Sequence, residues 1–134
     1  MKNLKKEYQQ RGFFKKRNII EKNLVKKIIS EINSIIEDNG LSEYVKFTGL
    51  CADMPAAYKI SDIVVSPANK PEGFGRIIIE SQSMNVPVIA SAHGGSLELI
   101  KNNYNGLLFK PNNEHDLADK LKYLLLINVY PNKT

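Results

Sequence analysis

The feature that most constrains the fold is a glycine-containing segment between a predicted strand and a predicted helix. Residues 62–67 read Asp-Ile-Val-Val-Ser-Pro, which predicts a short buried strand followed by a turn. Residues 76–84 have few polar positions and predict a helix. Between them, Gly73 and Gly75 permit unusual backbone angles and a close approach to a ligand. Ligands of open α/β sheets bind at such junctions, so we expect a binding site here.

The charged residues at this junction predict a ligand with two polar ends. The first N–H groups of the helix, near Arg76 and Ile77, suit a phosphate, which would also relieve the unfavourable position of Arg76 at the helix start. Glu72 in the preceding loop can accept hydrogen bonds from sugar hydroxyls. Glu80 follows three isoleucines, 77–79, that we expect to be mostly buried, and a ribose diol would supply its donors. A capping acid, a solvated arginine and an exposed glutamate explain the segment alone equally well.

Composition indicates one ordinary globular domain. The chain has 134 residues, 43% of them hydrophobic and 25% charged, and no run approaches 18 apolar residues. The first six residues are basic without the apolar core of a signal peptide. Cys51 is the single cysteine, which excludes an internal disulfide and suits a reducing compartment. We therefore expect a cytoplasmic protein in which Cys51 is a small buried residue.

The net charge of +5 is unevenly distributed. Residues 1–27 carry a net charge of +8, and the rest of the chain carries −3. A solvated helix face is the favoured interpretation of the basic end, with a weak peripheral contact to the inner face of a membrane as the alternative. No nucleic-acid-binding module accompanies the charge, so a nucleic acid is not an expected partner.

The amino-terminal half is expected to contain two helices and a strand. Residues 1–17 show no clean period and are expected to be irregular or a frayed helix. A helix is expected from Asn18, its cap, to Asn39-Gly40, and a short strand at 45–48. The apolar stripe of this first helix comprises Ile20, Leu24, Ile28, Ile32 and Ile35. A second helix is expected over 53–61, with Asp53 as its cap.

The carboxyl-terminal half is expected to alternate strands and helices. The expected elements are a strand at 87–91, a helix from Ser96, its cap, to about Asn102, a strand at 107–109 and a helix opening at Asn113. The final helix is expected to pack on the sheet through Leu117, Leu121, Leu124 and Leu125. Residues 128–134 are expected to be disordered. His93 is interpreted as a loop histidine, with a proton donor as the alternative, and no His/Cys cluster predicts a metal site.

An ordered series of motifs resembles the family 4 retaining glycosyltransferases, which have the GT-B architecture. Glu72 and Glu80, with seven residues between them, resemble the E-x7-E signature of that family. Further matching segments occur in the expected order at residues 45–49, 53–58, 87–91, 94–98 and 105–109. The resemblance covers about residues 40 to 126. An isolated G-x-G would be a weak signal, whereas this ordered series is specific.

The resemblance implies a nucleoside-diphosphate sugar as donor substrate, with no further cofactor. Glu72 would bind the sugar and is the candidate catalytic residue. The backbone amides of residues 74–77 would bind the sugar and diphosphate, and Glu80 the ribose. The base would lie near Leu50 and Cys51. The complete candidate set is Leu50, Cys51, Glu72, Gly73, Phe74, Gly75, Arg76, Ile77, Glu80, Gly94, Gly95 and Glu98.

The fold implied is an incomplete GT-B carboxyl-terminal lobe: a partial Rossmann-like parallel sheet of about four strands, flanked by helices, over residues 18–127. In the Rossmann order 3-2-1-4-5-6, the motifs match strands 3 to 6, and strands 1 and 2 are missing. Residues 45–48 must then pair directly with 62–66 or leave backbone groups unpaired. The usual phosphate-clamping Arg and Lys follow strand 1, so they have no counterpart here.

Two functions of different classes remain. The chain is either the donor-binding half of a glycosyltransferase, active only with a separate chain that supplies the missing amino-terminal lobe, or a non-catalytic remnant that associates with a partner through its sheet edge. In either case we expect no turnover by these 134 residues alone. The resemblance suggests cell-envelope polysaccharide biosynthesis as the process.

Overall fold

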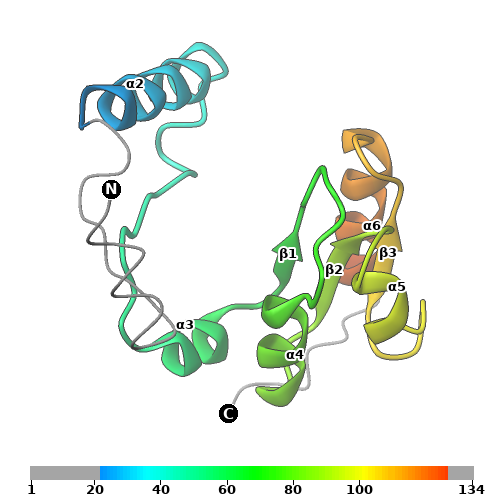
Figure 1. The fold of residues 1–134 in the computed structure, drawn as a ribbon. Helices are drawn as coiled ribbons and strands as arrows, with labels where there is room; N and C mark the ends of the chain where they lie inside the picture. Colours follow the sequence, from blue (N-terminus) through cyan, green and yellow to red (C-terminus); the bar gives the residue numbers. More distant parts are fainter. Residues whose placement is uncertain (1–21, 127–134) are drawn as a thin grey trace, which may run out of the picture. The chain divides into compact units, whose positions relative to one another are not determined.

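The computed structural model describes residues 22–126, so the predictions for 1–17 and 128–134 lie outside the described residues. The chain divides into two compact units, Met1–Gly49 and Leu50–Thr134, each of which is described here by itself. In Figure 1 the first unit contains helix α2, and the second contains the three described strands and the other described helices.

The first unit contains one described helix, α2 (Lys22–Asp38), as the apolar stripe predicted. Gly40 follows it with φ +64°, the left-handed conformation expected of a helix-ending glycine. The predicted cap Asn18 lies outside the described residues. Within the described stripe, the side chains are exposed by 38 to 62%.

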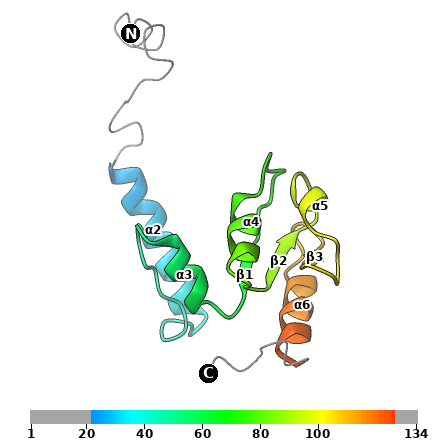
Figure 2. The same ribbon diagram turned by 90° about the horizontal axis from the view of Figure 1, so that it is seen from below.

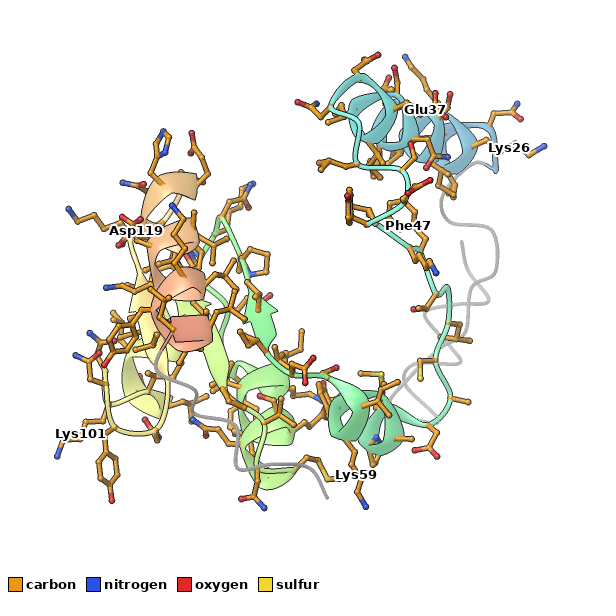
Figure 3. All side chains as sticks on the ribbon, turned by 180° about the vertical axis from the view of Figure 1, so that it is seen from behind. Lys26, Glu37, Phe47, Lys59, Lys101 and Asp119 are labelled. Carbon is orange, nitrogen blue, oxygen red and sulfur yellow. The ribbon has the colours of Figure 1, made fainter. Side chains whose placement is uncertain are left out.

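The strand predicted at residues 45–48 is wrong, because this segment has no regular structure. Phe47, which is labelled in Figure 3, is 63% exposed. A strand satisfies its backbone groups through a neighbouring strand. In the Rossmann order 3-2-1-4-5-6 the neighbour of strand 3 is strand 2, to which no motif was matched. A strand-like segment without a partner strand therefore remains irregular.

The second unit is an α/β unit with a three-stranded parallel sheet in the order β1-β2-β3. This confirms the partial Rossmann-like class, with three strands in place of about four. Its elements are α3 (Met54–Ile60), β1 (Val64–Ser66), α4 (Arg76–Ser83), β2 (Val88–Ser91), α5 (Ser96–Leu99), β3 (Leu107–Phe109) and α6 (Glu114–Leu126). Val64, Val65 and Ser66 of β1 pair with the first three residues of β2, and β2 pairs with β3 from Ile89 onward.

Side chains alternate between the two faces of the sheet, so each face has its own apolar cluster. On one face, Val88 and Ala90 of β2 pack with Ile78 of α4 and Ile100. On the other face, Ile89 packs with Leu107, Phe109 and Leu124. Figure 2 shows α4 and α6 on opposite sides of the sheet. The sheet is therefore the middle of three layers.

Of the three predicted helix caps that lie in the described residues, two are confirmed. The Asp53 carboxylate accepts a hydrogen bond from the Ala56 N–H at 3.0 Å, and the Asn113 side chain accepts one from the Asp116 N–H at 2.9 Å. The predicted cap Ser96 is wrong: α5 has Gly95 at its N-cap and ends at Leu99, before Asn102. The Ser96 hydroxyl instead accepts from the His93 N–H at 3.2 Å, which stabilises the preceding loop.

Three apolar residues are more exposed than the sequence predicted. Ile77 and Ile79 of α4 are 42% and 36% exposed, whereas Ile78 between them is 1% exposed. Leu125 of α6 is 59% exposed, although Leu117, Leu121 and Leu124 pack on the sheet as expected. A helix against a sheet buries one stripe only, so neighbours in sequence fall on different sides.

Among the described residues, no helix is long and apolar enough to span a bilayer.

Candidate functional site

The candidate site is formed by two loops that follow adjacent parallel strands. Residues 67–75 follow β1 and residues 92–95 follow β2, so both loops lie at the carboxyl edge of the sheet. The Gly95 N–H donates to the Glu72 carbonyl at 2.9 Å. The His93 Nε2 lies 2.8 Å from the Ala68 carbonyl oxygen. The two glycine-containing loops, which the sequence predicts separately, are therefore in direct contact through hydrogen bonds.

Close packing between these loops explains the glycines of the second one. A Cβ atom at Gly94 would lie 2.7 Å from the Glu72 carbonyl oxygen, and Gly94 has φ +58°. A Cβ atom at Gly95 would lie 3.0 Å from the Gly73 carbonyl oxygen. By contrast, a Cβ atom at Gly73 would meet nothing within 4 Å. The structure thus gives Gly94 and Gly95 a packing role that is independent of any ligand.

The first turn of α4 has backbone donors available. Gly75 is the N-cap with φ 55°, a left-handed conformation, and no side chain caps the helix. The first N–H groups of a helix have no partner within the helix, so those of Arg76 and Ile77 are suited to an anionic ligand. Phe74, 67% exposed, and Glu72, also exposed, lie in the loop just before them.

Glu80, one turn further along α4, is held by two side chains. The Tyr58 hydroxyl of α3 donates to Glu80 Oε2 at 2.8 Å. Arg76 donates to Glu80 Oε1 from Nη2 at 2.9 Å and from Nε at 3.2 Å. The hydrogen bonds from Arg76 and then from Tyr58 lower the pKa of the Glu80 carboxyl. Burial and then the Glu80 hydrogen bond raise the pKa of the Tyr58 hydroxyl.

The positions of Arg76 and Glu80 in α4 are unfavourable for helix stability. A cation in the first turn opposes the helix dipole. The order with the acid before the base at i, i+4 is the more favourable one, and here it is reversed. The Arg76 side chain is 80% exposed, where an ion pair contributes little. Helix stability therefore does not explain why an arginine occupies this position.

A small cavity lies under the junction of the two loops. Its lining residues are Ser66, Ala68, Glu72, Gly75, Ile78, Ala90, Ser91, His93 and Ser96. Ser91 Oγ and His93 Nδ1 are buried and have no hydrogen-bond partner among the described residues. The cavity has room for about one water molecule and is too small for a sugar. Glu72 lines it and Glu80 does not, so the structure does not bring the two acids into one enclosed pocket.

The remaining candidates lie farther from this junction in the chain. Leu50 is fully exposed, and Cys51 is partly exposed with its Sγ 3.2 Å from the Asp53 carbonyl oxygen, so the expectation of a buried Cys51 is wrong. Glu98 is an exposed residue in the first turn of α5. Among residues 22–126, no group of three or more His, Cys, Asp or Glu side chains is arranged to hold a metal.

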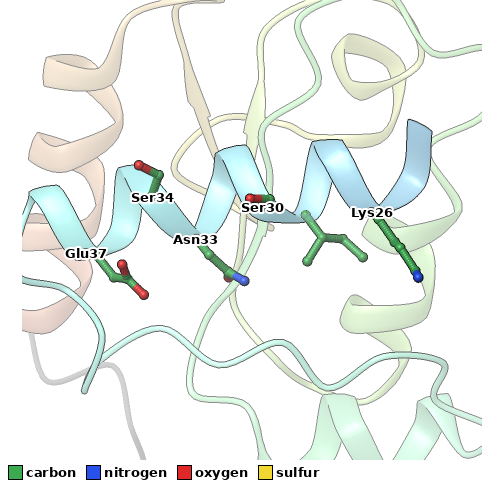
Figure 4. Close-up of a pocket in the computed structure, with 6 residues that line it drawn as sticks. Lys26, Ser30, Asn33, Ser34 and Glu37 are labelled. Atoms are coloured by element: carbon green, nitrogen blue, oxygen red, sulfur yellow. The ribbon is translucent and has the colours of Figure 1, made fainter. Parts of the chain in front are cut away.

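A larger hollow lies along α2 in the first unit, as Figure 4 shows. All six lining residues come from this single helix, from Lys26 to Glu37. An open surface between the side chains of one helix encloses no ligand. We therefore do not regard it as a candidate site.

Comparison with known proteins identifies the family. The model of the family "Glycosyl transferases group 1" matches residues 26–133, which is most of the chain. The chain belongs to the group 1 glycosyl transferases. Among curated relatives, the GDP-mannose-dependent alpha-(1-6)-phosphatidylinositol monomannoside mannosyltransferase of Mycobacterium tuberculosis is 28% identical over 106 residues. That match covers 73% of this chain and 28% of the relative.

Solved structures with the same fold include a group 1 glycosyl transferase, LpcC. HepE from Anabaena, in complex with UDP, has a TM-score of 0.75 and 32% identity, covering 78% of this chain and 29% of HepE. The carboxyl-terminal domain of LpcC from Francisella tularensis has a TM-score of 0.67 and 30% identity, covering 84% of this chain and 55% of that domain. This chain thus spans less than a third of the full-length relatives and about half of an isolated carboxyl-terminal domain.

Three residues that the structure brings to the site, Tyr58, Ser91 and Ser96, are not among the site residues that the sequence predicts. Tyr58 belongs to the 53–58 motif, and in the structure it is the buried hydrogen-bond partner of Glu80. The polar side chains of Ser91 and Ser96, at the end of β2 and the start of α5, line the small cavity. A tyrosine in an apolar helix face carries no sequence signal for a partner 22 residues away. Ser91, as a polar residue at the end of an apolar strand, was the available signal.

Proposed function

We propose that this chain forms part of the donor-binding half of a glycosyltransferase that uses a nucleoside-diphosphate sugar. The observation that supports this most is the junction of the two loops with the start of α4, where uncapped N–H groups follow Gly75 and are flanked by Glu72 and Glu80. HepE, with the same fold at 32% identity, was solved with UDP and, in another crystal, with UDP-glucose. A nucleotide sugar has hydroxyls at one end and a diphosphate in the middle. Both groups are suited to the acids and the backbone amides of this junction.

Each candidate residue has a distinct role in this proposal. Glu72 accepts hydrogen bonds from the donor sugar. The amides of residues 74–77 bind the sugar and diphosphate, with Gly73 and Gly75 allowing the close approach. Glu80 accepts from the ribose diol, which leaves Arg76 free to turn toward the diphosphate. Leu50 and Cys51 are proposed near the base, and Gly94, Gly95 and Glu98 near the sugar or phosphates.

We propose that sugar transfer involves polypeptide beyond these 134 residues. The chain spans about 28% of the mannosyltransferase of Mycobacterium tuberculosis and 29% of HepE, so the whole-protein activity and the acceptor are proposals. We propose that another polypeptide segment supplies the acceptor lobe and that the isolated chain does not turn over substrate. Cytoplasmic location, a weak contact of the basic end with the membrane, and cell-envelope polysaccharide biosynthesis remain predictions.

Nucleotide titration tests the binding proposal. The purified chain is titrated with four ligands: UDP, GDP, UDP-glucose and GDP-mannose. Binding is followed by calorimetry. Glu80→Ala should weaken both the nucleotide and the nucleotide sugar by about tenfold, because a hydrogen bond to a charged group is lost. Glu72→Ala should weaken only the nucleotide sugar. Asp119→Ala, an exposed acid of α6 labelled in Figure 3, is the matched control and should change neither affinity.

The competing function is a non-catalytic interaction module. The observation in its favour is that β1 is the edge of the described sheet, with no strand on its outer side. This function predicts no saturable signal with any of the four ligands at millimolar concentration. Equal binding by wild type and Glu80→Ala would also contradict the donor-binding proposal.

A further inference from the structure

A buried tyrosine fixes the acid that we propose to bind the ribose. Tyr58 lies on α3, its side chain is 5% exposed, and its hydroxyl donates to Glu80 Oε2 at 2.8 Å. Figures 1 and 2 both show α3 beside α4, and the two helices are in contact. The position of this hydroxyl is set by the packing of a rigid ring, which loses few rotamers on burial.

The second partner of Glu80 is of a different kind. Arg76 binds Oε1, but its side chain is 80% exposed, and its long stem reorients at little cost. The two oxygens of one carboxylate are therefore held by a buried donor and by an exposed cation. When Arg76 turns to an anion, Tyr58 still holds the carboxylate in place.

The hydrogen-bonding capacity of Glu80 is sufficient for a diol. An ionised carboxylate offers about four lone-pair positions. Tyr58 uses one on Oε2, so Oε2 accepts one further donor, and Oε1 accepts another once Arg76 leaves. The directions of both pKa shifts keep Tyr58 a donor and Glu80 an acceptor around neutral pH.

We propose that Tyr58 is a positioning residue that holds Glu80 in the orientation required to accept both hydroxyls of a ribose diol. This inference rests on the proposed function, because it concerns the same ligand. The alternative role of the Tyr58 hydroxyl is to pin α3 to α4 without influence on the ligand. The two roles differ in which part of the ligand is affected when the hydroxyl is removed.

The test compares a ribose diol with a ligand that lacks it. Wild type and Tyr58→Phe are titrated with UDP and with 2′,3′-dideoxy-UDP, or with the guanosine pair if GDP is the tighter ligand. Wild type should prefer the diol, and Tyr58→Phe should reduce that preference by about tenfold while its affinity for the dideoxy nucleotide is unchanged. Adding Glu80→Ala to both proteins should abolish the difference, since Tyr58 acts only through Glu80.

The outcomes separate this inference from the proposed function. If wild type binds no nucleotide, both are overturned. If wild type binds nucleotides and Tyr58→Phe keeps the full preference for the diol, or loses affinity for both ligands equally, only the positioning role is overturned. Urea unfolding of Tyr58→Phe establishes that the variant is folded. If it is not, Glu80→Gln, which keeps an acceptor oxygen beside an intact Tyr58, should retain part of the diol preference, and its complete loss would overturn the inference.

Discussion

At the scale of single residues, glycines that sequence alone would treat alike have different reasons to be glycine. Gly75 and Gly94 have left-handed backbones, and Gly94 also lies against the backbone of Glu72. Gly73 meets no such constraint, since a Cβ atom there would have open space around it. If the proposed function is correct, Gly73 is therefore the glycine of this junction whose identity is explained by the ligand and not by packing.

Gly94→Ala should destabilise the protein, whereas Gly73→Ala should not. The left-handed conformation alone costs a non-glycine residue about 1–2 kcal/mol, and the clash with the Glu72 carbonyl oxygen at 2.7 Å adds to it. Urea unfolding followed by circular dichroism measures both variants. Equal free energies of unfolding for the two would contradict the close packing of the loops.

The hydrogen bond between Tyr58 and Glu80 should make stability depend on pH in a defined window. Because the Glu80 pKa is below its ordinary 4.5 in the folded protein, its stabilisation is present above that value and is lost as pH falls through the folded-state pKa. Because the Tyr58 pKa is above its ordinary 10.0, its stabilisation is present below that value and is lost as pH rises through the folded-state pKa.

Tyr58→Phe should therefore be most destabilising between these two limits. The difference in unfolding free energy between wild type and variant should be largest near neutral pH, and it should shrink as pH falls through the folded-state pKa of Glu80 and as pH rises through that of Tyr58. Urea titrations across this range measure it. A difference that is constant with pH would show that the hydroxyl does not bond an ionised Glu80.

At the scale of elements, the two faces of the sheet decide which residues of a helix matter. Leu124 and Leu125 are adjacent in α6 and have the same intrinsic helix propensity. Leu124 is 7% exposed and packs with Ile89, Leu107 and Phe109, whereas Leu125 is 59% exposed. The sequence pattern alone assigned both to the core.

Leu124→Ala should cost about 2–5 kcal/mol of stability through lost burial and the cavity left behind. Leu125→Ala is the matched control, with the same change on the exposed side of the same helix, and should cost no more than about 0.5 kcal/mol. Thermal or urea unfolding of both variants decides the matter. Comparable losses would contradict the packing of α6 on the sheet.

At the scale of the whole molecule, the chain is part of a domain type that is longer in its relatives. It covers 55% of the carboxyl-terminal domain of LpcC. In the described sheet β1 is an edge, and residues 45–48 have the sequence of a strand without its structure. The prediction that strands 1 and 2 of the Rossmann order are missing from these 134 residues explains both features.

Supplying those strands should convert residues 45–48 into a strand. In a chimera, the full 134-residue chain is fused to the part of the LpcC domain that lies outside the match. Amide hydrogen exchange at residues 45–48 should slow by about tenfold or more, because the amides gain inter-strand hydrogen bonds. The amides of β3, at the other edge, serve as the control and should be unaffected. Unchanged exchange at 45–48 would contradict the missing-strand explanation.

The sequence by itself determined the local elements and the class of the fold. The apolar periods predicted α2, α3, α4, α6 and the three strands of the sheet, and the Asp53 and Asn113 caps were visible as residue types at the right spacing. The ordered motifs predicted the glycosyltransferase family, which the family comparison confirmed. These features depend on residues close together in the chain, which is why they can be read from it.

Only the tertiary structure decided which of these segments found partners. Residues 45–48 form no strand, because a strand is a pairing between two segments and none of the described strands pairs with them. The partners of Glu80, the contact of Gly94 with Glu72 and the exposure of Leu125 likewise depend on segments distant in sequence. A residue's type sets what it can bind, but long-range packing sets what lies within its reach.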